Sequence, residues 1–448
     1  MKQPKSLVRY YSTDGTAHLK NTPLTKLTQL PSGIRVASGE GLGGVATVGL
    51  WIDAGSANET DSNNGVSNFF QTVALKGAKA KDIEALGGSV KGSAGREFTS
   101  FVAQARQQDV PQIVGALSDI VQSTSWSETN IESTRSGITS TLSALKHKGN
   151  FQTVVDHAHA SAFQGTPYAA QPLGELATVK KITASDLAEY QKNFVTAPNV
   201  VVVGTGDLKH DELVALVEKH FSLPAGPATP APGFVDFVGS EMRIRDDTVH
   251  LARAAFCYQV VARSHALYWP TRLLKVLLGA AWKRNSTAGV FTSSRLAETM
   301  GGEKLANEYQ TFYAPYKTTG IFGVYLETTE GKLEDATYEV FNEYQKLASY
   351  INPQELSRAK NQLKLEILSA YEKQEKFAED LAESVLSSSR VISVAEQWQR
   401  IDDIQVNDVL SLLQDYFTDV DPVVVAHGNT ETLPDFNILR GWTYWNRW

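Results

Sequence analysis

A proline-rich segment divides this 448-residue chain into two pieces of nearly equal length. Between positions 224 and 233 the chain carries Pro224, Pro227, Pro230 and Pro232 among alanines and glycines. Neither a helix nor an inner strand tolerates that density of proline, because proline lacks the backbone N–H that both structures need. The segment is therefore predicted to be a linker, and the equal lengths on either side suggest an internal repeat.

The two pieces do repeat one another in sequence. Residues 182–207 contain an amphipathic helix and then the run Val200–Val203, and residues 404–430 show the same order with Val423–Val425. A Gly-Gly pair before an expected strand at 98–103 recurs before an expected strand at 309–313. The helix expected over 127–148 has a longer counterpart from 352 to about 376. The pattern predicts an α+β fold of two tandem homologous domains, over 25–223 and 234–448, each an α/β sandwich.

Composition excludes several functions for this chain. The net charge of −7 argues against nucleic-acid binding, which needs a concentrated basic surface. The single cysteine, Cys257, excludes an internal disulfide framework and cysteine-rich zinc or iron–sulfur sites. No apolar run approaches the ~20 residues of a membrane-spanning helix, so no span is predicted.

The N-terminal 24 residues have the composition of a targeting extension. Lys2, Lys5 and Arg9 precede the first acidic residue, Asp14. A basic stretch without acids is typical of a mitochondrial presequence, and Arg9 stands three residues before a proposed cut between Tyr11 and Ser12. The alternative is a frayed polar terminus.

Three motifs suggest sites that their context does not support. Gly39, Gly41 and Gly44 match the glycine pattern of a dinucleotide-binding turn, but a strand and not a helix is expected next, so a hairpin turn is predicted. His157 and His159 are two residues apart and point to different sides of a helix, which argues against a shared metal. The Ser/Thr-rich stretch 286–294 is interpreted as a plain loop.

The most informative segment is 63–78. Val66, Phe69, Phe70 and Val73 follow helical spacing and predict one buried face. A second face then carries the polar residues Asn68, Gln71 and Thr72. An ordinary polar helix face explains these residues, yet their spacing is also that of H-x-x-E-H peptidases, in which two histidines hold zinc and the glutamate polarises water.

A family resemblance covers nearly the whole chain. It is carried by the motifs at 48–56 (VGLWIDAGS), 63–65, 75–77, Arg96–Glu97 with Thr99, His159 with 162–167 (AFQGTP), and 239–247 (GSEMRIRDD). With these motifs the chain resembles the pitrilysin-like family that includes the β subunit of mitochondrial processing peptidase and core protein 1 of respiratory complex III, the cytochrome c reductase. The resemblance implies tandem domains of the processing-peptidase type.

The chain departs from this family at its zinc site. Alignment on Gly65 and Lys76 places the family's two zinc histidines on Asn68 and Thr72 and its catalytic glutamate on Gln71. The distal glutamate ligand falls near Thr141 and Lys148, and neither is an acid. Neutral side chains hold zinc poorly, and an amide cannot take a proton from water. No metal, no cofactor and no catalytic residue are therefore expected in this chain.

The resemblance implies a non-catalytic structural core subunit of mitochondrial complex III, peripheral on the matrix side of the inner membrane. A core protein 2-like subunit would complete a hollow heterodimer, with cytochrome b, cytochrome c1 and the Rieske protein as further partners. The alternative is a non-catalytic, presequence-binding subunit of a processing peptidase. An active metallopeptidase would need ligands at unrelated positions.

Two expectations concern contacts. A proline-rich linker predicts a modest interface between the two domains, with their open faces covered by another chain. The last eight residues, 441–448, include three of the eight tryptophans of the chain, too many for a solvated tail. We expect this tail to dock on a neighbouring complex III subunit, the alternative being that it folds back on its own domain.

Overall fold

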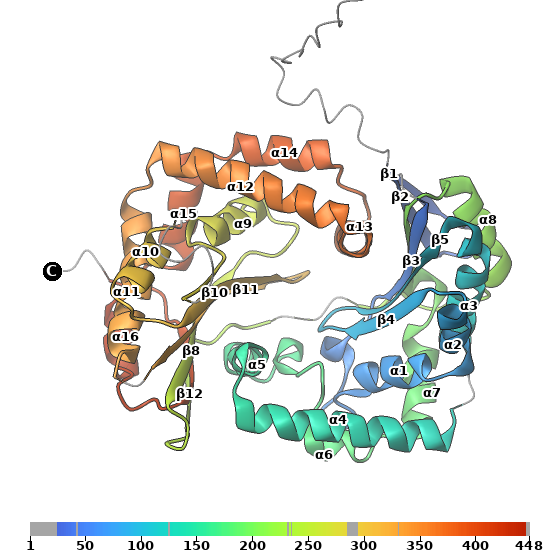
Figure 1. Ribbon diagram of the computed structural model, residues 1–448, viewed down its shortest axis with the longest axis horizontal. Coiled ribbons are helices and arrows are strands. Elements are labelled where there is room, and N and C mark those ends of the chain that lie inside the picture. The colour runs from blue at the N-terminus through green and yellow to red at the C-terminus, as the bar shows by residue number, and fades with distance from the viewer. Residues whose placement is uncertain are drawn as a thin grey trace, which may run out of the picture.

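The computed structural model describes residues 25–41, 44–123, 126–230, 233, 235–284, 294–329 and 331–444. Two mixed β-sheets, each with its own helices, face one another across the molecule (Figure 1). The predicted α+β fold of two tandem domains is confirmed. The N-terminal residues 1–24 and most of the Ser/Thr-rich stretch, 285–293, lie outside the described residues.

The first sheet has the strand order β1-β2-β6-β3-β5-β4. Its strands are β1 (Thr25–Gln29), β2 (Arg35–Glu40), β3 (Val45–Ile52), β4 (Ser89–Ala94), β5 (Thr99–Arg106) and β6 (Val200–Gly206). The pair β2–β6 is parallel and the other pairs are antiparallel.

The second sheet has the order β7-β12-β8-β11-β10-β9. Its strands are β7 (Glu241–Arg245), β8 (Leu251–Val260), β9 (Ala281–Lys283), β10 (Glu308–Pro315), β11 (Gly320–Thr329) and β12 (Val423–Gly428). Here β7–β12 is the parallel pair, so five strands of each sheet share one topology and β7, β12, β8, β11 and β10 correspond to β2, β6, β3, β5 and β4. The internal repeat is therefore a repeat of the whole fold.

Helices follow the same repeated order. Those of the first half are α1 (Val66–Leu75), α2 (Ala78–Ala85), α3 (Val110–Gln122), α4 (Glu128–Lys148), α5 (Phe151–Ala162), α6 (Leu176–Val179), α7 (Ala184–Phe194) and α8 (His210–His220). Those of the second half are α9 (Tyr268–Leu277), α10 (Arg295–Gly302), α11 (Leu333–Ser349), α12 (Pro353–Glu372), α13 (Gln374–Ser388), α14 (Val394–Asp403), α15 (Val406–Tyr416) and α16 (Phe436–Gly441). The helix expected over 127–148 is confirmed as α4, whereas its counterpart α12 ends at Glu372, because the backbone of Lys373 turns to an extended conformation before α13 begins.

Two local expectations were wrong, for different reasons. The glycine-rich turn does not close a hairpin, because β6 lies between β2 and β3, and the Gly41 amide donates to the Gly206 carbonyl at 2.7 Å. The expected strand at 98–103 is β5, whereas the one at 309–313 is β10, the counterpart of β4. The sequence of β4, SVKGSA, has little apolar character, so this edge strand was missed.

Each half covers the far face of the other half's sheet with one helix. The helix α13 packs on the first sheet, where Leu381, Ala382 and Val385 meet Trp51 and Val203. Its counterpart α5 packs on the second sheet, where Val154 and Ala158 belong to one apolar cluster with Cys257, Tyr325 and Val425. In Figure 1 these two helices lie in the space between the sheets. The two halves are therefore in contact through α5 and α13, and the covering of their open faces by another chain stays a prediction.

This exchange explains the valine runs. Successive residues of a strand point to opposite faces, so a strand buried on both sides is apolar throughout. In β6, Val200 and Val202 face the first half's own core, while Val201 and Val203 face α13. The valines of β12 are divided in the same way between the second half's core and α5.

The proline-rich segment is fastened to the first half. The amide of Ala197 donates to the Pro224 carbonyl at 3.1 Å, and the amide of Thr229 donates to Asn199 Oδ1 at 2.6 Å. Beyond the segment, the Val238 amide donates to the Ala162 carbonyl at 2.8 Å. The segment thus runs along the first half and ends beside the helix α5 that crosses to the second sheet.

The start of the C-terminal tail folds back on its own half. The ring of Trp442 packs edge-on against Tyr338 and Phe341, with centroids 5.3 and 5.9 Å apart, and the Thr443 carbonyl accepts from Gln345 Nε2 at 3.1 Å. For Trp442 and Thr443 the docking expectation was wrong, because α11 offers an aromatic surface within reach. Residues 445–448 lie outside the described residues, and their docking stays a prediction.

Replacing Trp442 with alanine should lower the free energy of unfolding by about 2 kcal/mol, less than the ~3–5 kcal/mol of a fully buried tryptophan. The reason is the loss of the ring contacts with α11. Ile438→Ala, at a half-exposed position of α16, is the matched control and should cost less than ~0.5 kcal/mol. Urea unfolding of both variants measures the difference, and equal losses would contradict the packing role of Trp442.

Candidate functional site

The helix α1 places the candidate site beside β4. As predicted, Val66, Phe69, Phe70 and Val73 are buried in the core of the first half. Phe70 packs edge-on against Phe101 and Trp126, which fixes the rotation of the helix about its axis. That rotation decides which residues α1 presents on its other face.

The N-terminus of α1 is held by a buried carboxylate. Glu59 accepts hydrogen bonds from the amides of Gly65 and Ser67 at 2.6 and 2.8 Å and from the Ser67 hydroxyl at 2.6 Å. Burial raises the pKa of Glu59, and these donors oppose the rise. Gly65 has a φ of 95° and its Cα lies where Gly174 approaches, so a side chain there would meet backbone at 2.8 Å.

Two of the three residues at the predicted site, Gln71 and Thr72, have side chains that contact other parts of the protein. The Thr72 hydroxyl donates to the Asn68 carbonyl at 2.8 Å, one helical turn back. Gln71 is 6% exposed, and its amide lies against Gly92 of β4 so closely that a Cβ on Gly92 would stand 2.0 Å from Gln71 Nε2. Gln71 therefore fills the space between α1 and the edge strand.

The distal positions lie on α4, which runs antiparallel to α1 (Figure 1). Lys76 Nζ donates to Ser133 Oγ at 2.9 Å and ties the two helices together. Counting eight residues along each helix from this bond places Asn68 and Thr141 at the same level, since both helices rise about 1.5 Å per residue. Thr141 is exposed and its hydroxyl donates to the Gly137 carbonyl at 3.0 Å. Nothing is described of the Lys148 side chain.

These residues do not fit a zinc ion. Zinc in proteins takes thiolate, imidazole and carboxylate ligands, and Asn68, Gln71, Thr72 and Thr141 offer none of these groups. Within the described part of the chain, no three His, Cys, Asp or Glu side chains are grouped so that they could hold a metal ion. The hydrogen bond of Thr72 and the packing of Gln71 also show a face arranged for neutral side chains.

The other family motifs meet at the junction of the two halves. Arg96, before β5, forms a buried ion pair with Asp156 of α5 at 2.8 Å and donates to the Tyr168 carbonyl at 3.1 Å. Glu97 accepts from the Tyr168 hydroxyl at 2.6 Å and from the amide of Lys317 in the second half at 2.9 Å. The sequence pointed to Arg96 and Glu97 but not to their role, because their partners are distant in the chain. Arg96 joins its partners within the first half, whereas Glu97 joins that half to Lys317 of the second half.

His159 belongs to the same junction. Its Nδ1 lies 2.7 Å from the Val155 carbonyl and its Nε2 lies 2.8 Å from the Tyr316 hydroxyl. Since a carbonyl can only accept, Nδ1 donates and Nε2 accepts from the tyrosine, which fits a neutral ring. Burial, together with nearby Arg96, holds the pKa of His159 well below its usual 6.5.

This histidine should make stability depend on pH. Because the folded-state pKa of His159 is depressed, the unfolded chain takes up its proton first as the pH falls below about 6.5. The wild-type protein should lose up to ~1.4 kcal/mol per pH unit from this group between pH 6.5 and 5. The free energy of unfolding of His159→Gln should fall less steeply over this pH range. His265→Gln, at an exposed position, should keep the wild-type slope. Urea unfolding across this range measures the slopes, and equal slopes for all three proteins would contradict the assignment.

The fold is that of two tandem homologous domains, and α1 of the first carries the neutral residues Asn68, Gln71 and Thr72. Residues 35–175 match the family described as insulinase (peptidase family M16), and residues 181–363 match the peptidase M16 inactive domain. The chain belongs to peptidase family M16.

Relatives of two kinds are similar to the chain at nearly the same level. Mitochondrial-processing peptidase subunit beta of Dictyostelium discoideum is 33% identical over 462 residues, covering 100% of this chain and 98% of the relative. Cytochrome b-c1 complex subunit 1 of Mus musculus is 31% identical over 462 residues, covering 100% and 96%. A chain of complex III2 from Candida albicans superposes with a TM-score of 0.85 at 25% identity, covering 94% of this chain and 99% of that chain. Identity alone therefore does not separate the two kinds of function.

Proposed function

We propose that this chain is a non-catalytic core subunit of mitochondrial complex III, which carries electrons from ubiquinol to cytochrome c. The observation that carries the proposal is the replacement of all three H-x-x-E-H positions of α1 by Asn68, Gln71 and Thr72. A peptidase of this family needs both imidazoles and the carboxylate, so their joint loss removes ligand and base together. The similarity to cytochrome b-c1 subunit 1 supports the same assignment.

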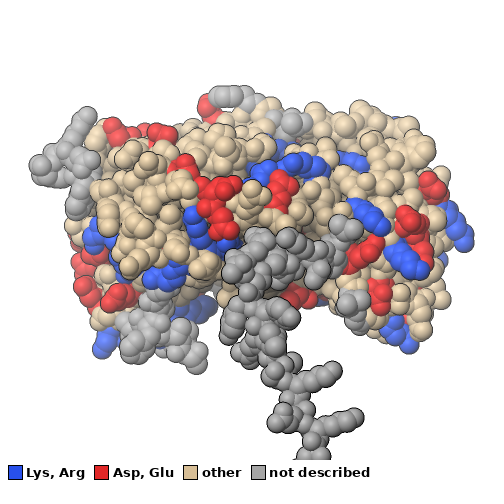
Figure 2. Space-filling view, turned by 90° about the horizontal axis from the view of Figure 1, so that it is seen from above, with Lys and Arg blue, Asp and Glu red and all other residues tan. Residues whose placement is uncertain are grey.

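The proposal places the subunit on the matrix side of the inner membrane. Its partners there would be a core protein 2-like subunit, cytochrome b, cytochrome c1 and the Rieske protein. No helix in the described residues combines the length and apolar composition needed to cross a membrane. On the face shown in Figure 2, basic and acidic side chains are interspersed without an extended patch of one sign, which does not favour nucleic acid as a partner.

A second candidate is a non-catalytic, presequence-binding subunit of a processing peptidase. The similarity to processing-peptidase β subunits at 33% identity favours it. In that assembly another chain would have to hold the zinc, because α1 of this chain offers no ligand for it.

Purification of the tagged chain from mitochondria separates the two candidates. As a complex III subunit, it should migrate on a native gel with haem-bearing chains and with ubiquinol–cytochrome c reductase activity. Asn68→Ala with Thr72→Ala, at partly buried positions, should leave that activity within about twofold of wild type, since neither side chain has a catalytic role. Co-migration with a presequence-cleaving activity and without haem would establish the second candidate and overturn the first.

A further inference from the structure

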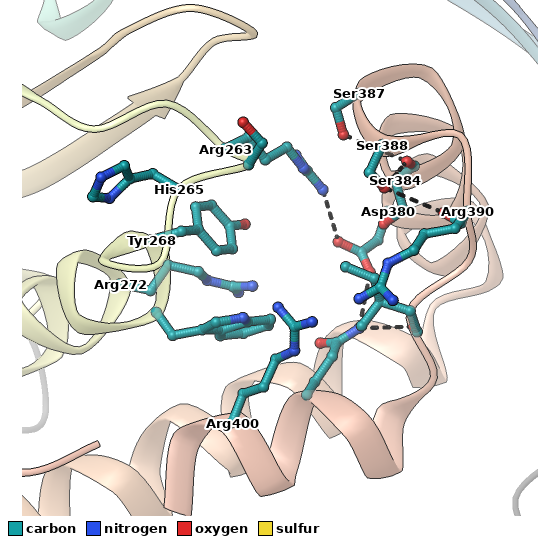
Figure 3. A pocket seen from close by; sticks show the side chains of 14 residues that line it. Arg263, His265, Tyr268, Arg272, Asp380, Ser384, Ser387, Ser388, Arg390 and Arg400 are labelled. Atoms are coloured by element: carbon teal, nitrogen blue, oxygen red, sulfur yellow. Dashed lines mark hydrogen bonds and ion pairs between the residues drawn. The ribbon is translucent and has the colours of Figure 1, made fainter. Parts of the chain in front are cut away.

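A small basic cavity lies in the second half, far along the chain from the altered zinc positions. It has a volume of about 160 Å³ and is lined by the loop after β8, by α9, by the end of α13 and by α14. The side chains of Arg263, Arg272, Arg390 and Arg400 point into it from these separate elements (Figure 3). Four guanidinium groups around one cavity repel one another unless anions balance them.

The carboxylates of the protein balance three of these four arginines. Arg263 forms ion pairs with Asp380, at 3.4 Å, and with Glu383. Glu396 forms ion pairs with Arg390, at 2.6 Å, and with Arg400, at 2.7 Å. The Tyr371 hydroxyl also donates a hydrogen bond to the carboxylate of Asp380, at 2.5 Å.

Arg272 is the exception. Its guanidinium carbon lies 5.2 Å from the ring centroid of Trp269 and 5.9 Å from that of Tyr268, so aromatic faces hold it in place. No carboxylate of the described residues lies within ion-pair distance of it. A cation removed from water without a counter-ion is costly, and the aromatic faces compensate only in part. The cavity therefore holds one positive charge in excess, four arginines against Asp380, Glu383 and Glu396, and Arg272 carries it.

We propose that this cavity binds the phosphate group of an anionic ligand. The planar fork of a guanidinium matches two phosphate oxygens at once, and donors that converge from different elements suit a tetrahedral dianion better than a flat carboxylate. The cavity of about 160 Å³ has room for a phosphate group but not for a folded partner. A small phosphorylated molecule and a phospholipid headgroup both carry this chemistry.

Occupancy of the cavity would also act on the exchanged helix. Ser384 and Ser388 of α13 line the same cavity as Arg272 of α9 and Arg400 of α14. An anion bridging these elements would fix the end of α13 that crosses to the first sheet, so ligand binding would stabilise the whole molecule by mass action.

The test measures phosphate binding to the full chain by isothermal titration calorimetry at low ionic strength, with inorganic phosphate as the probe. Wild type should bind saturably and with one site. Arg272→Gln should weaken this binding about tenfold or more, as expected for loss of a charge-assisted hydrogen bond. Arg245→Gln, which removes an exposed arginine of β7 in the same half, should change the affinity less than about twofold.

A flotation assay identifies the source of the phosphate group. Vesicles of phosphatidylcholine with phosphatidic acid, compared with phosphatidylcholine alone, show whether a lipid headgroup is accepted in addition to the free ion; binding to either probe that depends on Arg272 supports the proposal. Should Arg272→Gln fail to fold, Arg400→Gln, at a 43% exposed side chain, replaces it in both assays. Wild type that binds neither probe, or binding that the cavity variants leave unchanged, overturns the proposal.

Discussion

Truncation of Leu381 to alanine should lower the free energy of unfolding by about 2–5 kcal/mol. Leu381 is 1% exposed and packs from α13 onto the first sheet in one cluster with Trp51 and Val201. Leu381 lies in the second half of the sequence, but its side chain packs on the sheet of the first half. Its loss opens a cavity that the rigid sheet cannot close.

The exchange of helices adds a qualitative expectation. Because α5 and α13 each complete the other half's sheet, neither half can unfold without exposing the apolar face of the other. Urea unfolding of wild type and of Leu381→Ala should therefore each show one transition, with tryptophan fluorescence and far-ultraviolet circular dichroism coinciding. Leu365→Ala, at a 63% exposed position of α12, is the matched control and should cost less than ~0.5 kcal/mol. Two separated transitions, only the first of them shifted by Leu381→Ala, would show that the halves are independent.

What the sequence predicted correctly follows from local periodicity. The stripe of Val66, Phe69, Phe70 and Val73 requires one buried helix face, and the structure buries all four. Two valine runs at equivalent places predicted equivalent strands, now seen as β6 and β12. Such patterns predict which face of a helix or strand is buried, and this prediction does not require knowing which element covers that face.

What the sequence missed depends on partners far away in the chain. The helical spacing of α5 and α13 shows that one face is apolar, but not that this face meets the sheet of the other half. The turn after β2 looked like a hairpin because β6, which separates β2 from β3, comes about 160 residues later. The ion pair of Arg96 with Asp156 and the unbalanced charge of Arg272 are likewise tertiary properties that no spacing in the sequence reports.

The family relationship makes a strong prediction about gain of metal binding. The variant with Asn68→His, Gln71→Glu, Thr72→His and Thr141→Glu should hold one zinc ion per chain, whereas wild type should hold none. The two histidines would lie one helical turn apart on α1, and the glutamate at 141 would approach from the same level of α4. Elemental analysis of dialysed protein measures the stoichiometry.

Two controls assign the ligands. A triple variant that lacks Thr141→Glu should bind zinc far more weakly, because two histidines leave the ion without its third protein ligand. A triple variant that keeps Gln71 should bind as tightly as the quadruple variant, since the residue between the histidines acts on water and does not hold the metal. A quadruple variant that folds but binds no zinc would show that this face of α1 is not the former metal site.

The effect on stability should have opposite signs without and with the metal. Gln71 lies almost buried against Gly92, so a glutamate of the same size fits there but places a negative charge where the wild-type chain has none. The metal-free quadruple variant should therefore melt below wild type, because a buried carboxylate without a partner costs free energy. Zinc at a free concentration one hundred times its dissociation constant should raise the free energy of unfolding of the quadruple variant by about 2.7 kcal/mol. That reversal would show why the present face carries amides and a hydroxyl: in a chain that holds no zinc, neutral side chains let α1 pack against β4 without an ion to balance them.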